Sequence, residues 1–128
     1  MSEINYLVGK KNLKSSFLKP YSKIIIDFLD EFSKNLKKTP NISQYPDLLY
    51  LSFWCRKQNL ENLRKDFYEK NKKIKTGIGL IFHITPSNVP TNFAYSLIFG
   101  LLTGNSNIVK APSKKFFQID CICDVINF

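Results

Sequence analysis

The sequence predicts an α/β protein with a basic, mainly helical segment over residues 1–75 and a strand–helix–strand–helix unit over residues 76–128. Apolar residues recur at helical spacing in the first part, whereas a near-continuous apolar run follows Gly77 in the second. Strands that alternate with helices favour a parallel sheet. Two strands make a poor sheet on their own, so we expect the sheet to be incomplete.

The first part is expected to hold three helices and one short strand. The strand is predicted over residues 4–8. A helix can begin at Pro20 and end at residues 39–41, because one apolar stripe lies between them. That stripe is Ile24, Ile25, Phe28, Leu29, Phe32 and Leu36. A second helix is predicted to begin at Pro46 and Asp47, with its body over residues 48–57. A third follows Asn59, with Leu60, Leu63 and Phe67 on one face, and leads into a charged linker over residues 70–76.

The second part begins with an apolar run over residues 78–84, whose length and flanking turn residues predict a strand buried on both faces. A turn over residues 85–90 leads into a mostly buried helix over residues 91–103, which ends at Gly104. The pattern then predicts a second strand over residues 107–110. A final helix is expected over residues 114–126.

The charge and cysteine content narrow the functional classes. The net charge is +9, and most of it comes from residues 1–75, which contain 16 basic and 8 acidic residues. Only two of the 19 basic residues are Arg, so a solvated lysine-rich surface is favoured over a sequence-specific nucleic-acid reader. Three cysteines and no secretory pattern predict a reducing, cytoplasmic location. No apolar run is long enough to suggest a membrane span.

Two polar segments follow the predicted strands, at residues 85–90 and 110–113. Ligands of open α/β sheets bind outside the carboxyl ends of the strands, so these segments are the candidate site. An amide between two prolines (Asn88) is a well-placed hydrogen-bond donor, and a lysine that ends a strand (Lys110) suits ribose hydroxyls or phosphate. Neither GxGxxG nor the phosphate-binding GxxxxGK[ST] occurs. The residues alone thus predict an α/β unit with an anion or nucleotide site.

A family resemblance extends this prediction. Residues 84–90, Ile-Thr-Pro-Ser-Asn-Val-Pro, resemble the I-x-P-x-N-x-P turn of the aldehyde dehydrogenase superfamily. Residues 104–110, Gly-Asn-Ser-Asn-Ile-Val-Lys, resemble its G-N-x-x-x-x-K strand. Residues 45–47 and 53–60, Tyr-Pro-Asp and Phe-Trp-Cys-Arg-Lys-Gln-Asn-Leu, are similar to the front half of bacterial long-chain acyl-CoA reductases, the LuxC-type enzymes of bioluminescence. The resemblance implies the start of a Rossmann-like NADP-binding domain in residues 76–128.

The resemblance also implies a chemistry. In that family an acyl group passes to a cysteine as a thioester, and NADPH reduces it to a fatty aldehyde. Asn88 would be the catalytic oxyanion donor, or in the structural alternative a helix cap or Asx turn. The cofactor-binding residues would be Ile84, Thr85, Pro86, Ser87, Lys110 and Ser113. Many NAD-preferring relatives have a glutamate at the position of Ser113, so the serine suggests NADPH, although it could also cap the last helix.

The remaining reactive side chains favour structural roles. Cys55, Cys121 and Cys123 are expected in the core, outside any nucleophile motif, and Cys121 and Cys123 are spaced so that they cannot share a metal. His83, inside a predicted strand, is expected to be a hydrogen-bonded core or strand-end histidine, not a catalytic base. The resemblance therefore describes an N-terminal fragment that lacks its catalytic cysteine and that we expect to be inactive alone.

Two alternatives stay open at this stage. The chain could belong to another aldehyde dehydrogenase superfamily member with a different substrate. It could instead be a non-catalytic basic interaction module that binds nucleic acid through residues 10–75, with a steep salt dependence. In the reductase interpretation the partners are a long-chain acyl-CoA or acyl-protein substrate, an acyl-protein synthetase and an acyltransferase.

Overall fold

A computed structural model describes residues 3–127 and contains five α-helices and one short 3-10 helix. The helical first part comprises α1 (Lys23–Leu36), the 3-10 turn η1 (Ile42–Gln44), α2 (Pro46–Trp54) and α3 (Lys57–Lys70). The second part comprises β1 (Leu80–Ile84), α4 (Asn92–Leu102), β2 (Ser106–Lys110) and α5 (Phe117–Asn127). The predicted order of helices and strands in the second part is therefore confirmed.

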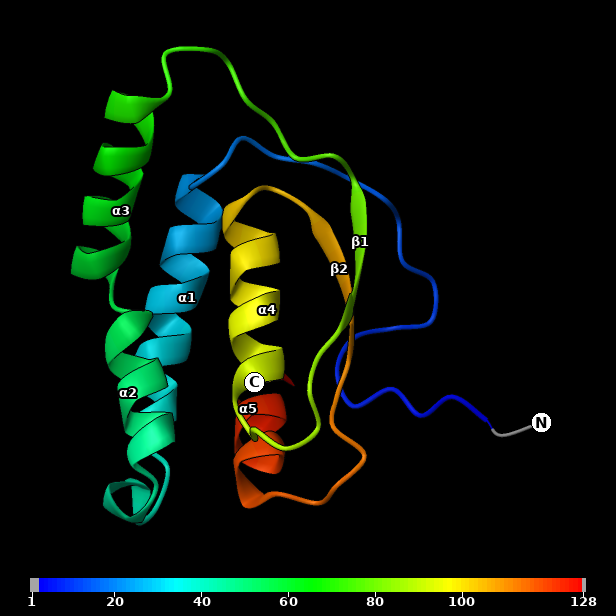
Figure 1. Ribbon diagram of the computed structural model, residues 1–128. Helices are drawn as coiled ribbons and strands as arrows, with labels where there is room; N and C mark the ends of the chain where they lie inside the picture. Colours follow the sequence, from blue (N-terminus) through cyan, green and yellow to red (C-terminus); the bar gives the residue numbers. More distant parts are fainter. Residues whose placement is uncertain (1–2, 128) are drawn as a thin grey trace.

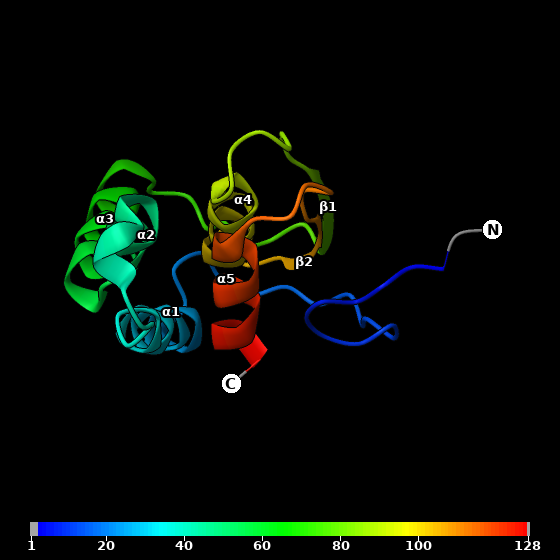
Figure 2. The same ribbon diagram turned by 90° about the horizontal axis from the view of Figure 1, so that it is seen from below.

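The two strands are parallel neighbours, with Leu80 opposite Ser106 and Ile84 opposite Lys110. Figure 2 shows all five helices on one side of this strand pair, with α4 next to the strands. The chain is therefore mixed α/β with an unclosed sheet of two strands, covered by helices on one face only (Figure 1).

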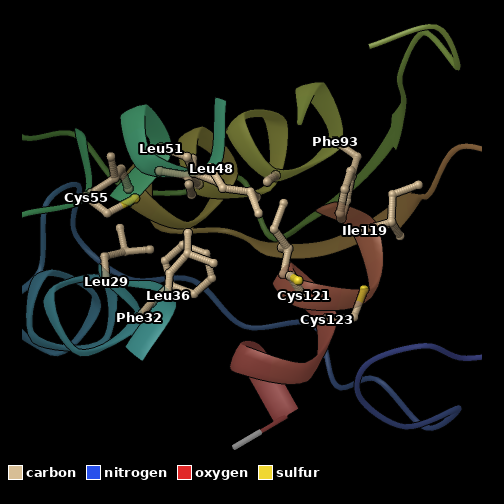
Figure 3. Close-up of a cluster of buried hydrophobic side chains, with 14 of the residues drawn as sticks. Leu29, Phe32, Leu36, Leu48, Leu51, Cys55, Phe93, Ile119, Cys121 and Cys123 are labelled. Atoms are coloured by element: carbon tan, nitrogen blue, oxygen red, sulfur yellow. The ribbon is translucent and has the colours of Figure 1, made fainter. Parts of the chain in front are cut away.

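The core lies among the helices. Its side chains come from all five helices, with Leu60 as the buried residue of α3. Figure 3 shows side chains of α1, α2, α4 and α5 pointing toward one another. The amphipathic stripe of α1 supplies Ile26, Leu29, Phe32 and Leu36, all buried. Tyr45 and Phe117 stack with ring centroids 4.6 Å apart, so the start of α2 contacts the start of α5. This packing binds the basic first part to the second.

Two strand predictions need correction. Residues 4–8 form coil and bends, with no strand. The apolar run after Gly77 forms a strand with one exposed face, where Leu80, Phe82 and Ile84 alternate with half-buried neighbours. The reason is that α4 covers only the inward face of the pair, so every second side chain of β1 points to solvent.

Helix starts also differ from the prediction, because long-range contacts decide them. Tyr21 has a left-handed φ of 54°, and its N–H donates to the Leu102 carbonyl at 2.7 Å, so α1 begins only at Lys23. The third helix begins at Lys57, two residues before Asn59, since the Lys57 N–H donates to Asp30 Oδ1 at 2.8 Å. The last helix begins at Phe117, later than expected.

The starts of both strands are joined by one residue of the N-terminal segment. The Leu18 N–H donates to the Gly104 carbonyl at 2.8 Å, and the Leu18 carbonyl accepts from the Gly77 N–H at 3.0 Å. Gly104 has a φ of +87°, and a Cβ there would lie 2.1 Å from the Leu18 oxygen. Only glycine fits this position, both for its backbone conformation and for the close approach.

A polar cluster joins α4 to the strand pair. His83 of β1 lies with Nδ1 2.8 Å from Ser96 Oγ and Nε2 2.8 Å from Asn107 Oδ1. The Asn107 amide nitrogen donates to the Asn105 carbonyl, so its Oδ1 faces His83 and accepts. The Nε2–H of His83 therefore donates to Asn107 Oδ1, while Nδ1 forms a hydrogen bond with the Ser96 hydroxyl. Both strands and the helix share this cluster.

Within residues 3–127, no helix combines the length and the apolar character required to cross a bilayer.

Candidate functional site

The carboxyl ends of the two strands are adjacent. Ile84 and Lys110 are partners in the parallel register, so residues 85–91 and 111–116 leave the sheet from the same edge. Figure 1 shows both connections at the lower end of the strands, where α4 and α5 begin. The structure thus brings together the two segments that the sequence predicted as one site.

The first segment presents its polar groups outward. Pro86, Ser87 and Asn88 are exposed, whereas Thr85 is half-buried and its hydroxyl is enclosed without a hydrogen-bond partner among the described residues. Thr91 occupies the N-cap position of α4, and its side chain makes no capping bond. The Asn88 side chain forms no hydrogen bond within residues 3–127, so it caps nothing and its amide is available.

The second segment adds positive charge. Lys110 is exposed at the end of β2, and Ser113, Lys114 and Lys115 are exposed in the connection to α5. Lys114 Nζ lies 5.2 Å from the centroid of the Phe116 ring. Because α5 begins at Phe117, Ser113 is not its N-cap, and that structural alternative is wrong.

The charge around the strand ends favours an anion. Neither segment contains an Asp or Glu, and the three lysines outnumber the two acids near the α5 start, Asp120 in its first turn and Asp47, which accepts from Gln118. The starts of α4 and α5 lie at the same end, so the positive ends of both helix dipoles are directed toward it. A phosphate-bearing ligand matches this arrangement of donors and lysines.

Comparison with known proteins identifies the family. Residues 19–121, most of the chain, match the family model described as acyl-CoA reductase (LuxC). The chain belongs to the LuxC family of acyl-CoA reductases. No curated protein and no solved structure matches it significantly. The predicted resemblance is confirmed, and the roles of individual site residues in this LuxC-family chain stay predictions.

His83 does not point at the strand-end segments of this LuxC-family chain. It is half-buried, and both ring nitrogens are occupied by Ser96 and Asn107. The prediction of a hydrogen-bonded histidine is confirmed, although the side chain is half-buried and lies outside the apolar core. Its role in positioning was missed from sequence, although the polar Asn107 at the start of an apolar strand and the glycine inside α4 were available signals.

Gly100 makes the polar cluster possible. A Cβ on Gly100 would lie 1.9 Å from Asn107 Oδ1 and 2.9 Å from His83 Nε2. A helix-interior glycine costs up to about 1 kcal/mol relative to alanine, so its presence here requires a reason. That reason is the close approach of α4 to the strands that carry the site.

None of the three thiols has the properties of a nucleophile. All three cysteines are buried and form no disulfide, as predicted for core residues (Figure 3): Cys55, Cys121 and Cys123. Burial raises the pKa of the Cys55 thiol to about 12 and that of Cys123 to about 11. Burial also raises the pKa of Cys121, with the carboxylates Asp124 and Asp120 adding to the effect. A reactive cysteine requires the opposite, an accessible thiol with a lowered pKa.

The raised pKa of Cys55 predicts a loss of stability in alkali. An unfolded thiol ionises near its ordinary pKa of 9.0, whereas the folded thiol keeps its proton up to about pH 12. Between these values the unfolded state binds fewer protons, so the free energy of unfolding falls by up to about 1.4 kcal/mol per pH unit for this thiol. Urea unfolding across this pH range should show a shallower fall for Cys55→Ala. Equal slopes in both proteins would contradict the assignment.

Proposed function

We propose that this chain is the N-terminal part of an NADPH-dependent acyl-CoA reductase that converts a long-chain fatty acyl thioester to the fatty aldehyde. The supporting observation is the pairing of Ile84 with Lys110, which sets side by side the two segments that resemble aldehyde dehydrogenase superfamily motifs. Overall, a hydride and a proton are added as the C–S bond of the thioester breaks, so the products are an aldehyde and a free thiol. NADPH, when bound, would supply the hydride.

The cofactor fits the chemistry of the exposed groups. Lys110 can donate to ribose hydroxyls, while Ser113, Lys114 and Lys115 can hold the 2′-phosphate that distinguishes NADPH from NADH. A glutamate at residue 113 would repel that phosphate, and this chain has serine. The backbone and side chains of residues 84–87 would line the rest of the cofactor site.

Asn88 is proposed to stabilise the charge on the thioester oxygen during hydride transfer. Its amide lies in an exposed turn and makes no hydrogen bond within residues 3–127, so it is free to donate to a substrate oxygen. Pro86 and Pro90 stand two residues to either side and restrict the backbone, which limits the reorganisation needed at the moment of reaction.

No cysteine of this chain has the properties required of the thiol that accepts the acyl group. All three are buried, and burial raises each pKa. We therefore propose that the nucleophile belongs to residues outside this sequence, and that the chain alone binds cofactor without turning over substrate. An acyl-protein synthetase and an acyltransferase are the proposed partners that supply the acyl chain.

The cofactor assignment predicts the order of binding affinities. Calorimetric titration of the chain should show tighter binding of NADPH than of NADH. Lys110→Ala should weaken NADPH binding by about tenfold or more, because a charge-assisted hydrogen bond contributes about 1.5–3 kcal/mol. Ser113→Glu should weaken binding of NADPH more than that of NADH. The exposed Lys38→Ala, in the turn that follows α1, is the control and should change neither. Tighter binding of NADH, or equal effects of Lys110→Ala and Lys38→Ala, would refute the assignment.

The role of Asn88 predicts a kinetic signature in the complete enzyme. Asn88→Ala should lower kcat for acyl-CoA-dependent NADPH oxidation by about 100- to 1000-fold with little change in KM, as loss of an oxyanion donor does. The exposed Asn62→Ala on α3 is the matched control and should leave kcat unchanged. If Asn88→Ala raises KM and leaves kcat intact, Asn88 is only a binding residue.

A further inference from the structure

Five exposed lysines gather on two extended segments at the end of the strands opposite the candidate site. We call them the lysine strip: Lys14, Lys19, Lys72, Lys73 and Lys75. The segments lie side by side because the Leu18 carbonyl accepts from the Gly77 N–H at 3.0 Å and from Thr76 Oγ1 at 3.4 Å. The two segments also approach each other at Ser15 and Gly79, because a Cβ added to Gly79 would lie 3.0 Å from Ser15 Oγ. Figure 1 shows both segments passing close to one another above the strands.

The charge of the lysine strip is not balanced by acids. The sequence has no Asp or Glu over residues 4–26 or 70–119, which include both segments. Lysines on the helices differ, since Lys34 and Lys57 pair with Asp30 and Asp27. Across residues 3–127, no lysine of the strip forms an ion pair. The strip therefore differs from an ordinary lysine-rich helix surface, in which acidic side chains balance the lysines.

Apolar side chains protrude from the same segments. Ile74, flanked by Lys73 and Lys75, is 95% exposed, Ile78 is 85% exposed and Phe17 is 63% exposed. Side chains of this size favour burial by about 1.5–3 kcal/mol each when water is fully excluded. Basic groups interleaved with protruding apolar groups are the composition of surfaces that lie on anionic membranes.

We propose that the lysine strip, together with Phe17, Ile74 and Ile78, docks the protein on an anionic lipid bilayer. The lysines would contact phosphate headgroups, while the three apolar side chains enter the boundary of the acyl chains. The aliphatic stems of the lysines add apolar contact below their ammonium groups. The surface lies at the strand starts, about 15 Å from the strand ends by the rise of a five-residue strand, so it is distinct from the cofactor site.

A bilayer suits this surface better than other anionic partners do. Nucleic-acid-binding proteins use the planar guanidinium of arginine and stack bases on aromatic rings. The two segments contain no arginine, and two of the three protruding apolar side chains, Ile74 and Ile78, are aliphatic. A protein partner requires a complementary shape around its apolar anchors. A bilayer accepts isolated protruding side chains without such a pocket. The proposal goes beyond the proposed reductase function and does not rest on it.

Vesicle binding tests the proposal. The chain is sedimented with vesicles of phosphatidylcholine alone, or of phosphatidylcholine and phosphatidylglycerol in equal parts, at low and at physiological salt. We expect binding only to the mixed vesicles, with an affinity that falls as salt rises. Lys73→Glu/Lys75→Glu should weaken binding by about 30-fold or more. Ile74→Ser should weaken it by about fivefold or more at unchanged charge.

The matched control is Lys38→Glu/Lys65→Glu, which makes the same change of net charge at exposed positions in the turn after α1 and on α3. Circular dichroism checks that each variant folds. The proposal is overturned if both double variants lose binding equally, if pure phosphatidylcholine vesicles bind as well, or if no vesicle binds. It is also overturned if duplex DNA or polyglutamate binds the strip more tightly than the mixed vesicles. NADPH binding is expected to survive all these substitutions, so failure here is separable from failure of the proposed function.

Discussion

The close approach of α4 to the strand pair is the constraint on which the rest of the structure depends. Gly100 lets the helix reach Asn107 and His83, whose hydrogen bonds join both strands to Ser96. An unsatisfied polar group in this half-buried contact would cost about 1–3 kcal/mol, so the three side chains hold one arrangement. That arrangement sets the parallel register, and the register places Ile84 beside Lys110.

This geometry gives the two ends of the sheet different chemistry. At the strand ends, an exposed amide, three lysines and two helix starts face the solvent together. At the strand starts, the Leu18 backbone joins Gly77 and Gly104, so the two segments that carry the lysine strip come together there. Both ends carry exposed lysines, but only the segments at the strand ends resemble aldehyde dehydrogenase superfamily motifs. A phosphate cofactor and a lipid surface can thus occupy opposite ends without competing.

Local pattern in the sequence was enough to predict the elements of the second part, because apolar periodicity and the turn residues around Gly104 act over short distances. The adjacency of residues 85–90 and 110–113 was also predictable, since parallel strands end at one edge. The starts of α1 and α3 were not, because Tyr21 and Lys57 bond to residues distant in sequence. Periodicity likewise could not reveal that helices cover only one face of β1, nor that His83 turns toward α4.

The most direct test of this account is Gly100→Ala, measured by urea unfolding and by the amide NMR spectrum. The added methyl must displace Asn107 and His83. We predict a loss of about 1–3 kcal/mol in the free energy of unfolding, as for other overpacked sites. We also predict concerted shifts of the amide signals of Thr85, Ser87 and Asn88 in the first segment and of Lys110, Ala111 and Ser113 in the second. A variant as stable as the original chain, with both segments unshifted, would show that the contact between α4 and the strands does not hold the site together.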